Sequence, residues 1–128
     1  MSSIIRHVTV DCADPFRIAD FWAQVLGAAL DPEDEPGDDD AFVSLGSDLP
    51  GLLFIRVPEG KSVKNRIHFD LQPQDRSRDE EIERLVALGA SRVDDRRRPD
   101  GGGWMVMTDP EGNELCVEIS AAEREQLG

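Results

Sequence analysis

The sequence has no long apolar run, and its N-terminus lacks the apolar stretch of a secretory signal. Nowhere among its 128 residues do about eighteen or more apolar residues follow one another, as a membrane-spanning helix requires. The opening residues MSSIIRHVTV place Arg6 and His7 where a signal peptide needs its apolar core. We therefore expect a cytoplasmic protein with no membrane partner.

Cysteine and histidine are scarce, with two residues of each. Cys12 and Cys116 could pair only if the fold brought them together, and we expect free thiols in a reducing cytosol. There is no Ser-His-Asp arrangement or nucleophile elbow, and neither cysteine lies in a recognisable reactive motif. The sequence therefore disfavours hydrolysis through a covalent intermediate.

Basic residues are outnumbered, 14 against 27 acidic residues, which gives a formal net charge of −13. This balance excludes nucleic acid as a partner, because both would be strongly negative. Much of the excess lies in DPEDEPGDDD at 31–40, a composition typical of a solvated loop. The segment lacks the alternating acids and closing Glu of a calcium loop.

The first half of the chain predicts one helix among strands. Residues 4–12 alternate apolar and polar side chains, the pattern of a strand with two different faces. Asp14 then precedes an amphipathic helix that ends at Gly27. Three further strands are predicted, at 28–32, 41–45 and 52–57.

The second half repeats this order. The sequence predicts a strand at 65–72, a helix at 78–88 and strands at 91–97, 104–108 and 114–119. Gly27 and Gly89 lie 62 residues apart, and His7 and His68 lie 61 apart. Chance is the alternative, since Leu-Gly-Ala is common, but the matched order of five elements favours a tandem duplication.

We therefore predict an α+β protein of one domain, 1–128, with two βαβββ modules at about 4–58 and 65–120. The polar segment PEGKSVK at 58–64 suits a connection between modules, and the tail at 121–128 a short helix or frayed end.

Two such modules, each opening on a strand that carries a histidine, resemble the vicinal oxygen chelate superfamily of glyoxalase, bleomycin resistance and dioxygenase proteins. The most specific local similarity is GGGWMVMTDPEGNELCVEI at 101–119, where DPEGN resembles the turn before the last strand of glyoxalase-like proteins. The resemblance implies a curled mixed sheet around a cleft that binds a small organic molecule. It also implies a homodimer.

By this resemblance, the four metal-ligand positions of the family fall at His7, near Phe54, at His68 and near Cys116. A phenyl ring cannot bind metal, and a cysteine binds it only as a thiolate. Glu114 or Glu118 could replace the missing carboxylate, and we choose Glu118 as third ligand. The predicted metal and catalytic residues are thus His7, His68 and Glu118, with iron, manganese, nickel or zinc as the metal, or with no cofactor.

Several further residues are predicted to contact a ligand, each with a simpler alternative. Asp70 shares the strand face of His68 and could orient its ring or bind metal, or it is an exposed acid. Arg56 could pair with an anionic group, or it is an exposed strand arginine. Trp104 follows three glycines and could stack on a planar ligand, or it packs internally. Phe54 and Cys116 complete the predicted ligand-binding set.

Two functions from different classes follow. One is a metal-dependent lyase, isomerase or dioxygenase that acts on a substrate with vicinal oxygens, with the metal as Lewis acid. The other is a metal-free binding protein that sequesters an antibiotic or natural product, for which the acidic charge suits a cationic drug. The paired histidines favour the first function, whereas Phe54 and Cys116 at ligand positions favour the second.

Overall fold

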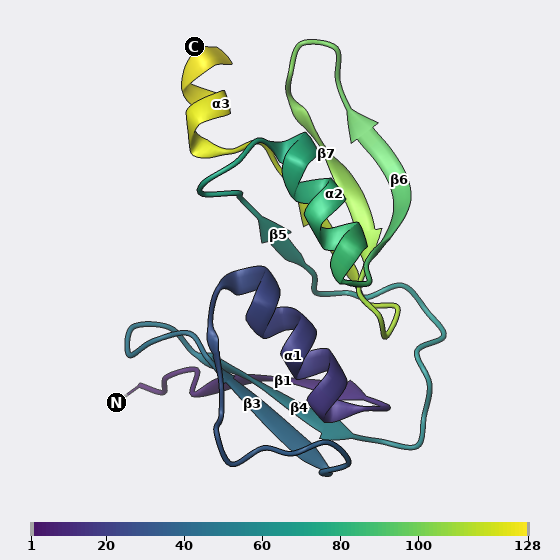
Figure 1. The fold of residues 1–128 in the computed structure, drawn as a ribbon. Helices are drawn as coiled ribbons and strands as arrows, with labels where there is room; N and C mark the ends of the chain where they lie inside the picture. Colours follow the sequence, from purple (N-terminus) through teal and green to yellow (C-terminus); the bar gives the residue numbers. More distant parts are fainter. Residues whose placement is uncertain (1, 128) are drawn as a thin grey trace. The chain divides into compact units, whose positions relative to one another are not determined.

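The structure, a computed structural model, describes residues 2–127 (Figure 1). The chain forms two compact units that divide between Lys61 and Ser62. Each unit contains one four-stranded mixed sheet and one longer helix, so the predicted α+β class and the two βαβββ modules are confirmed. No helix among residues 2–127 is long and apolar enough to cross a membrane.

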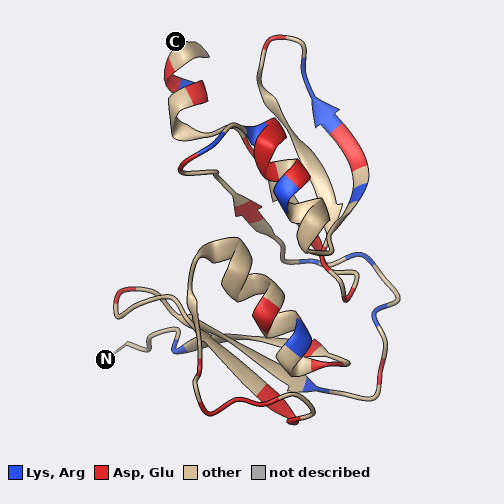
Figure 2. Ribbon diagram, viewed as in Figure 1, with Lys and Arg blue, Asp and Glu red and all other residues tan. Residues whose placement is uncertain are grey.

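The first unit contains β1 (His7–Cys12), α1 (Pro15–Leu26), β2 (Ala29–Leu30), β3 (Asp40–Ser44) and β4 (Gly51–Arg56). Its sheet has the order β1-β4-β3-β2. β1 and β4 are parallel, and the other pairs are antiparallel. The acidic segment predicted to be a loop connects β2 to β3, and its carboxylate residues are red in the ribbon of Figure 2. Most of its residues are exposed.

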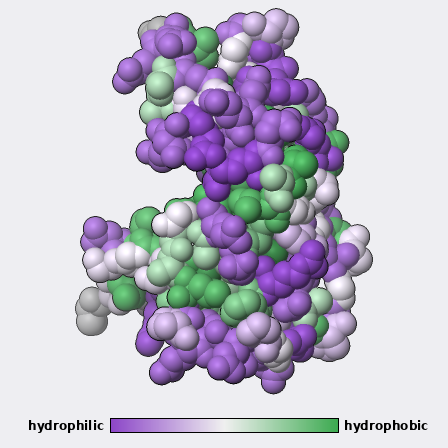
Figure 3. All heavy atoms as spheres, in the orientation of Figure 1, coloured by the Kyte–Doolittle hydropathy of each residue, from purple (hydrophilic) through white to green (hydrophobic). Residues whose placement is uncertain are grey.

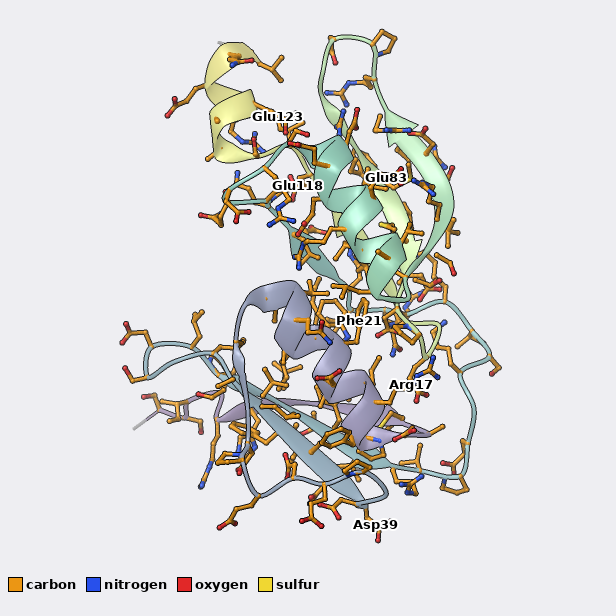
Figure 4. The ribbon with its side chains drawn as sticks, viewed as in Figure 1. Arg17, Phe21, Asp39, Glu83, Glu118 and Glu123 are labelled. Atoms are coloured by element: carbon orange, nitrogen blue, oxygen red, sulfur yellow. The ribbon has the colours of Figure 1, made fainter. Side chains whose placement is uncertain are left out.

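Helix α1 covers one face of this sheet. The Asp14 carboxylate accepts a hydrogen bond from the backbone N–H of Arg17 at 3.4 Å, and Gly27 ends the helix with φ 60°. Phe21, which Figure 4 labels together with Arg17, is buried. The buried side chains of the sheet are Cys12, Ala41, Val43, Leu52 and Phe54.

Phe54 is part of this core, with 1% of its surface exposed. It pairs with Val10, whereas its neighbour Leu53 pairs with Thr9. Because successive side chains of a strand point to opposite faces, Leu53 lies on the face of Thr9 and His7. The sequence-based placement of a cleft residue at Phe54 therefore differs from the structure by one position, which changes the face of the sheet.

The second unit contains β5 (Phe69–Leu71), α2 (Arg78–Leu88), β6 (Ser91–Arg97), β7 (Gly103–Thr108), β8 (Glu114–Val117) and α3 (Ala121–Leu127). Its sheet order, β5-β8-β7-β6, repeats that of the first unit, and β5 is parallel to β8. The core includes Ile82, Leu85, Met105, Met107, Leu115 and Val117. The visible surface over α2 and β6 is mostly hydrophilic (Figure 3).

Hydrogen bonds fix both ends of α2. Ser77 and Glu80 form a reciprocal capping box at its start. Arg78, which is 7% exposed, donates from Nη1 to the carbonyl oxygens of Gly102, in the turn between β6 and β7, and of Gly103, the first residue of β7. Glu123 of α3 accepts from the backbone N–H of Arg78 at 2.8 Å. The helix, the turn and the C-terminal segment are therefore held together.

Replacing Phe54 with alanine tests its role in the core. Phe54→Ala should lower the free energy of unfolding by about 3 to 5 kcal/mol, because it removes a fully buried ring and leaves a cavity. Ile55→Ala is the control: Ile55 is 36% exposed, and its loss should cost about 1 kcal/mol or less. Urea unfolding followed by circular dichroism measures both. Equal, small losses would contradict the core assignment.

Candidate functional site

The parallel pairing of β5 with β8 places three potential metal ligands together in the second unit. Asp70 lies directly opposite Cys116 in the register. His68 lies two residues before Asp70, and its Nδ1 is 3.1 Å from Asp70 Oδ1. One ligand atom from each of the three residues lies within 4.8 Å of the others. We call this set the His68–Asp70–Cys116 cluster.

The cluster lies in a pocket of about 600 Å³ on the face of the sheet opposite α2. Phe69 and Leu71 alternate with Asp70 on β5, so they point to the helix side while Asp70 points away from it. The remaining lining residues are Lys64, Asp94, Arg96, Trp104, Val106, Glu114 and Glu118. The alternation of β5, β7 and β8 therefore produces a core on one face and a polar pocket on the other.

Burial and the neighbouring carboxylate raise the pKa of the Cys116 thiol above its usual range. Desolvation is the larger cause, followed by the negative charge of Asp70 and a side-chain hydrogen bond to it. The positive charge of Lys64 acts in the opposite direction. Cys116 is therefore a neutral thiol at neutral pH in the absence of metal, which makes it a weak nucleophile.

Asp70 can also orient the ring of His68. When Nδ1 carries the proton and donates it to Asp70, Nε2 is left with a lone pair. A carboxylate on the other ring nitrogen is the usual support of an imidazole that binds metal. The side chains of His68 and Asp70 are 37% and 51% exposed, so both are accessible from the pocket.

Trp104 and Glu118 line the same pocket, outside the cluster. Trp104, on β7, is 41% exposed. Glu118 follows β8 (Figure 4), and its carboxylate lies 3.6 Å from Arg124 Nη2. Among residues 2–127, the close group of metal ligands contains His68, Asp70 and Cys116 and does not include Glu118. Five of the residues predicted from the sequence thus share one pocket.

The other predicted residues belong to the first unit. His7 lines a pocket of about 420 Å³, and its ring makes an edge contact with Phe42 at a centroid distance of 5.5 Å. Arg56 donates to the carbonyl oxygens of Ala13 and Asp38, and its Nε lies 3.2 Å from the Asp39 carboxylate. The guanidinium of Arg56 thus ties the end of β4 to the acidic loop.

Asp94 and Arg96 are pocket residues that the sequence did not reveal. The register of β6 against β7 shifts between Arg92 and Asp94, so the alternation changes face at this bulge. Asp94 then pairs with Val106 and Arg96 with Trp104, on the pocket face. Simple alternation along β6 carries no signal for such a shift.

Comparison with known proteins identifies the family. The sequence matches the family described as "Glyoxalase-like domain" over residues 7–118, and the chain belongs to this family. No curated protein sequence matches the chain significantly. The resemblance seen in the sequence is therefore confirmed at the level of the family.

Several solved structures share the fold. One is a mutant of FosX, a fosfomycin resistance protein from Listeria monocytogenes, in complex with manganese(II) and 1S,2S-dihydroxypropylphosphonic acid. Its TM-score is 0.69 and its sequence identity is 19%, and the match covers 97% of this chain and 95% of that chain. A glyoxalase/bleomycin resistance protein/dioxygenase family enzyme from Burkholderia phytofirmans has a TM-score of 0.66 and 15% identity, with 91% and 98% covered. The oxidase ChaP-H2 has a TM-score of 0.62 and 21% identity, with 94% of each chain covered. At these identities the similarity establishes the fold alone.

The influence of Asp70 on the thiol predicts a change in reactivity. Asp70→Asn should lower the pKa of Cys116, because it removes the charge that opposes thiolate formation. Alkylation of Cys116 by iodoacetamide at about pH 8, with a chelator present, should become several-fold faster. Mass spectrometry of the Cys116 peptide measures the rate.

Two controls accompany this measurement. Cys12 is 4% exposed and should remain almost unreactive in every sample. Glu118→Gln removes a charge that acts on Cys116 more weakly than those of Asp70 and Lys64, so it should change the rate little. An alkylation rate that is unchanged in Asp70→Asn would contradict the electrostatic role of Asp70.

Proposed function

We propose that the pocket of the second unit binds a divalent metal ion through the His68–Asp70–Cys116 cluster, together with a small oxygen-bearing organic ligand. The observation that carries the proposal is the spacing of an imidazole nitrogen, a carboxylate oxygen and a sulfur within 4.8 Å of one another. The manganese(II) in the FosX structure supports a metal-binding role for the fold.

The donor types in the cluster fit a divalent transition metal. Imidazole suits zinc, nickel and iron, and a thiolate favours the softer metals among them. Manganese prefers oxygen ligands, so among the four metals expected from the sequence we favour zinc for this chain. Cys116 would hold the metal as a thiolate, so it would lose its proton when the metal binds.

When bound, the metal acts as a Lewis acid that polarises an oxygen of the ligand. The residues of the chain bind and orient the ligand. Trp104 offers an exposed indole for a planar or apolar part of it, and Asp70 holds the imidazole of His68 in one tautomer. Glu118, in the same pocket, is the proposed proton acceptor.

Metal titration of the purified full chain tests the proposal. Cobalt(II), used as a spectroscopic substitute for zinc, should give a sulfur-to-metal charge-transfer band that Cys116→Ala abolishes. His68→Ala should weaken binding by more than about a hundredfold, and Asp70→Asn by about tenfold to a hundredfold. Asp94→Asn is the matched control: it changes an acid of the same pocket outside the cluster and should leave the affinity within about twofold.

Elemental analysis of the untagged protein complements the titration. About one equivalent of metal, lost in His68→Ala, is the expected result, and His7→Ala tests the sequence-based prediction that His7 is a further ligand. Absence of metal in every preparation, with no uptake on titration, would contradict the proposal.

A metal-free binding protein is the second candidate function. The raised pKa of the Cys116 thiol and its hydrogen bond to Asp70 favour this function, because a protonated thiol does not bind metal. The exposed indole of Trp104 favours it as well, because it offers a surface for an organic ligand. Such a protein would sequester an antibiotic or natural product without turning it over. In that case ligand affinity should be the same with and without a chelator, whereas the metal-dependent function requires it to fall when metal is removed.

A further inference from the structure

Lys64 is an uncompensated cation in the pocket. Two cationic side chains line the pocket, and one of them, Arg96, is neutralised by Asp94 at 2.7 Å. For the Lys64 ammonium, the structure of residues 2–127 shows neither a hydrogen bond nor an ion pair. The charge of Lys64 nevertheless reaches the cluster, because it acts on the pKa of Cys116.

The backbone beside Lys64 is fixed at the pocket. The N–H of Asn65 donates to the carboxylate of Glu114 at 3.1 Å, and its side-chain amide donates to Asn113 at 3.3 Å. Both acceptors lie where the chain enters β8, the strand that carries Cys116. These bonds anchor the backbone next to Lys64, whose side chain lines the same pocket as the cluster.

Within residues 2–127, the acidic side chains of the pocket form contacts with groups other than Lys64. Asp70 contacts His68, and Asp94 pairs with Arg96. Glu114 accepts from the backbone of Asn65, and Glu118 lies 3.6 Å from Arg124. Lys64 therefore remains the cation available to a ligand, although the pocket contains more acidic than basic side chains.

We propose that Lys64 recognises an anionic oxygen group, such as a carboxylate, on the ligand of this pocket. The ligand class is thus a small organic anion whose planar or apolar part contacts Trp104 and whose charged group binds Lys64. This role of Lys64 rests on one part of the proposed function, namely that the pocket binds a small molecule. It does not require the metal. Lys64 is a binding and specificity-determining residue in this arrangement.

Three probes of the same shape and different charge test the proposal: benzoate, benzamide and benzamidinium. Binding to the chelator-treated full chain is followed by tryptophan fluorescence. Trp104 should report it, because Trp22 is 3% exposed, and Trp104→Phe verifies the origin of the signal. Benzoate should bind most tightly, and its affinity should fall as the salt concentration rises.

Variants of Lys64 separate its charge from its position. Lys64→Met should weaken benzoate binding about tenfold, which corresponds to a lost hydrogen bond to a charged group at an exposed site, and should leave benzamide unchanged. Lys64→Arg should retain most of the affinity for benzoate. Lys61→Met is the matched control, because Lys61 lies in the same segment but does not line the pocket.

Tighter binding of benzamidinium than of benzoate would overturn the proposal, since the acidic side chains would then dominate. Equal losses in Lys64→Met and Lys61→Met would also overturn it, because only a long-range effect of charge would remain. Cobalt(II) titration of Lys64→Met distinguishes this failure from that of the metal site. If Lys64→Met binds cobalt and keeps its benzoate affinity, the role of Lys64 is rejected and the metal site is not. If benzoate binding depends on Lys64 but the chain binds no cobalt, the metal site is rejected and the role of Lys64 is not.

Discussion

The parallel pairing of the first and last strands of each unit is the constraint on which the rest of the structure depends. Parallel strands cannot be joined by a tight hairpin, so the chain must return through a crossover that includes a helix. In the second unit that helix, α2, covers one face of the sheet, and the pairing of β5 with β8 sets Asp70 opposite Cys116. The pocket then lies on the face of the same sheet that is opposite α2. A shift of this pairing by one residue would bury the polar residues and expose the core.

Asp70 is the electrostatic centre of the candidate site. Its carboxylate contacts His68 at 3.1 Å and raises the pKa of Cys116 together with burial. Without metal, these interactions keep the thiol protonated and form a hydrogen-bonded network. With metal, the same carboxylate is a ligand or holds the imidazole. For the proposed metal site, competition between the proton and the metal at Cys116 would determine whether the pocket acts as a metal site or as a polar binding site.

The sequence predicts the fold better than the site because the two depend on different signals. Helix caps such as Asp14 and Gly27 are local, and the repeated order of elements is visible without knowledge of contacts. Side-chain direction is less secure, because it requires the register. Phe54 was assigned to the ligand face but lies in the core, one position from Leu53. Asp94 was missed because a bulge precedes it. Lys64 lies outside any strand, so periodicity carries no information about it.

The two units have the same strand order but different side chains at corresponding positions. His7 and His68 hold equivalent places, yet the residues beside them differ. In the first unit Thr9 pairs with Leu53, whereas in the second unit Asp70 pairs with Cys116 at the corresponding positions. A threonine hydroxyl beside a leucine offers no charged or soft ligand, so the first unit cannot form the same cluster from its own sheet. The candidate cluster of the second unit therefore depends on two side chains on paired strands that differ from those of the first unit. Both lie on the face of the sheet opposite the helix, so the apolar residues that pack against the helix do not depend on them.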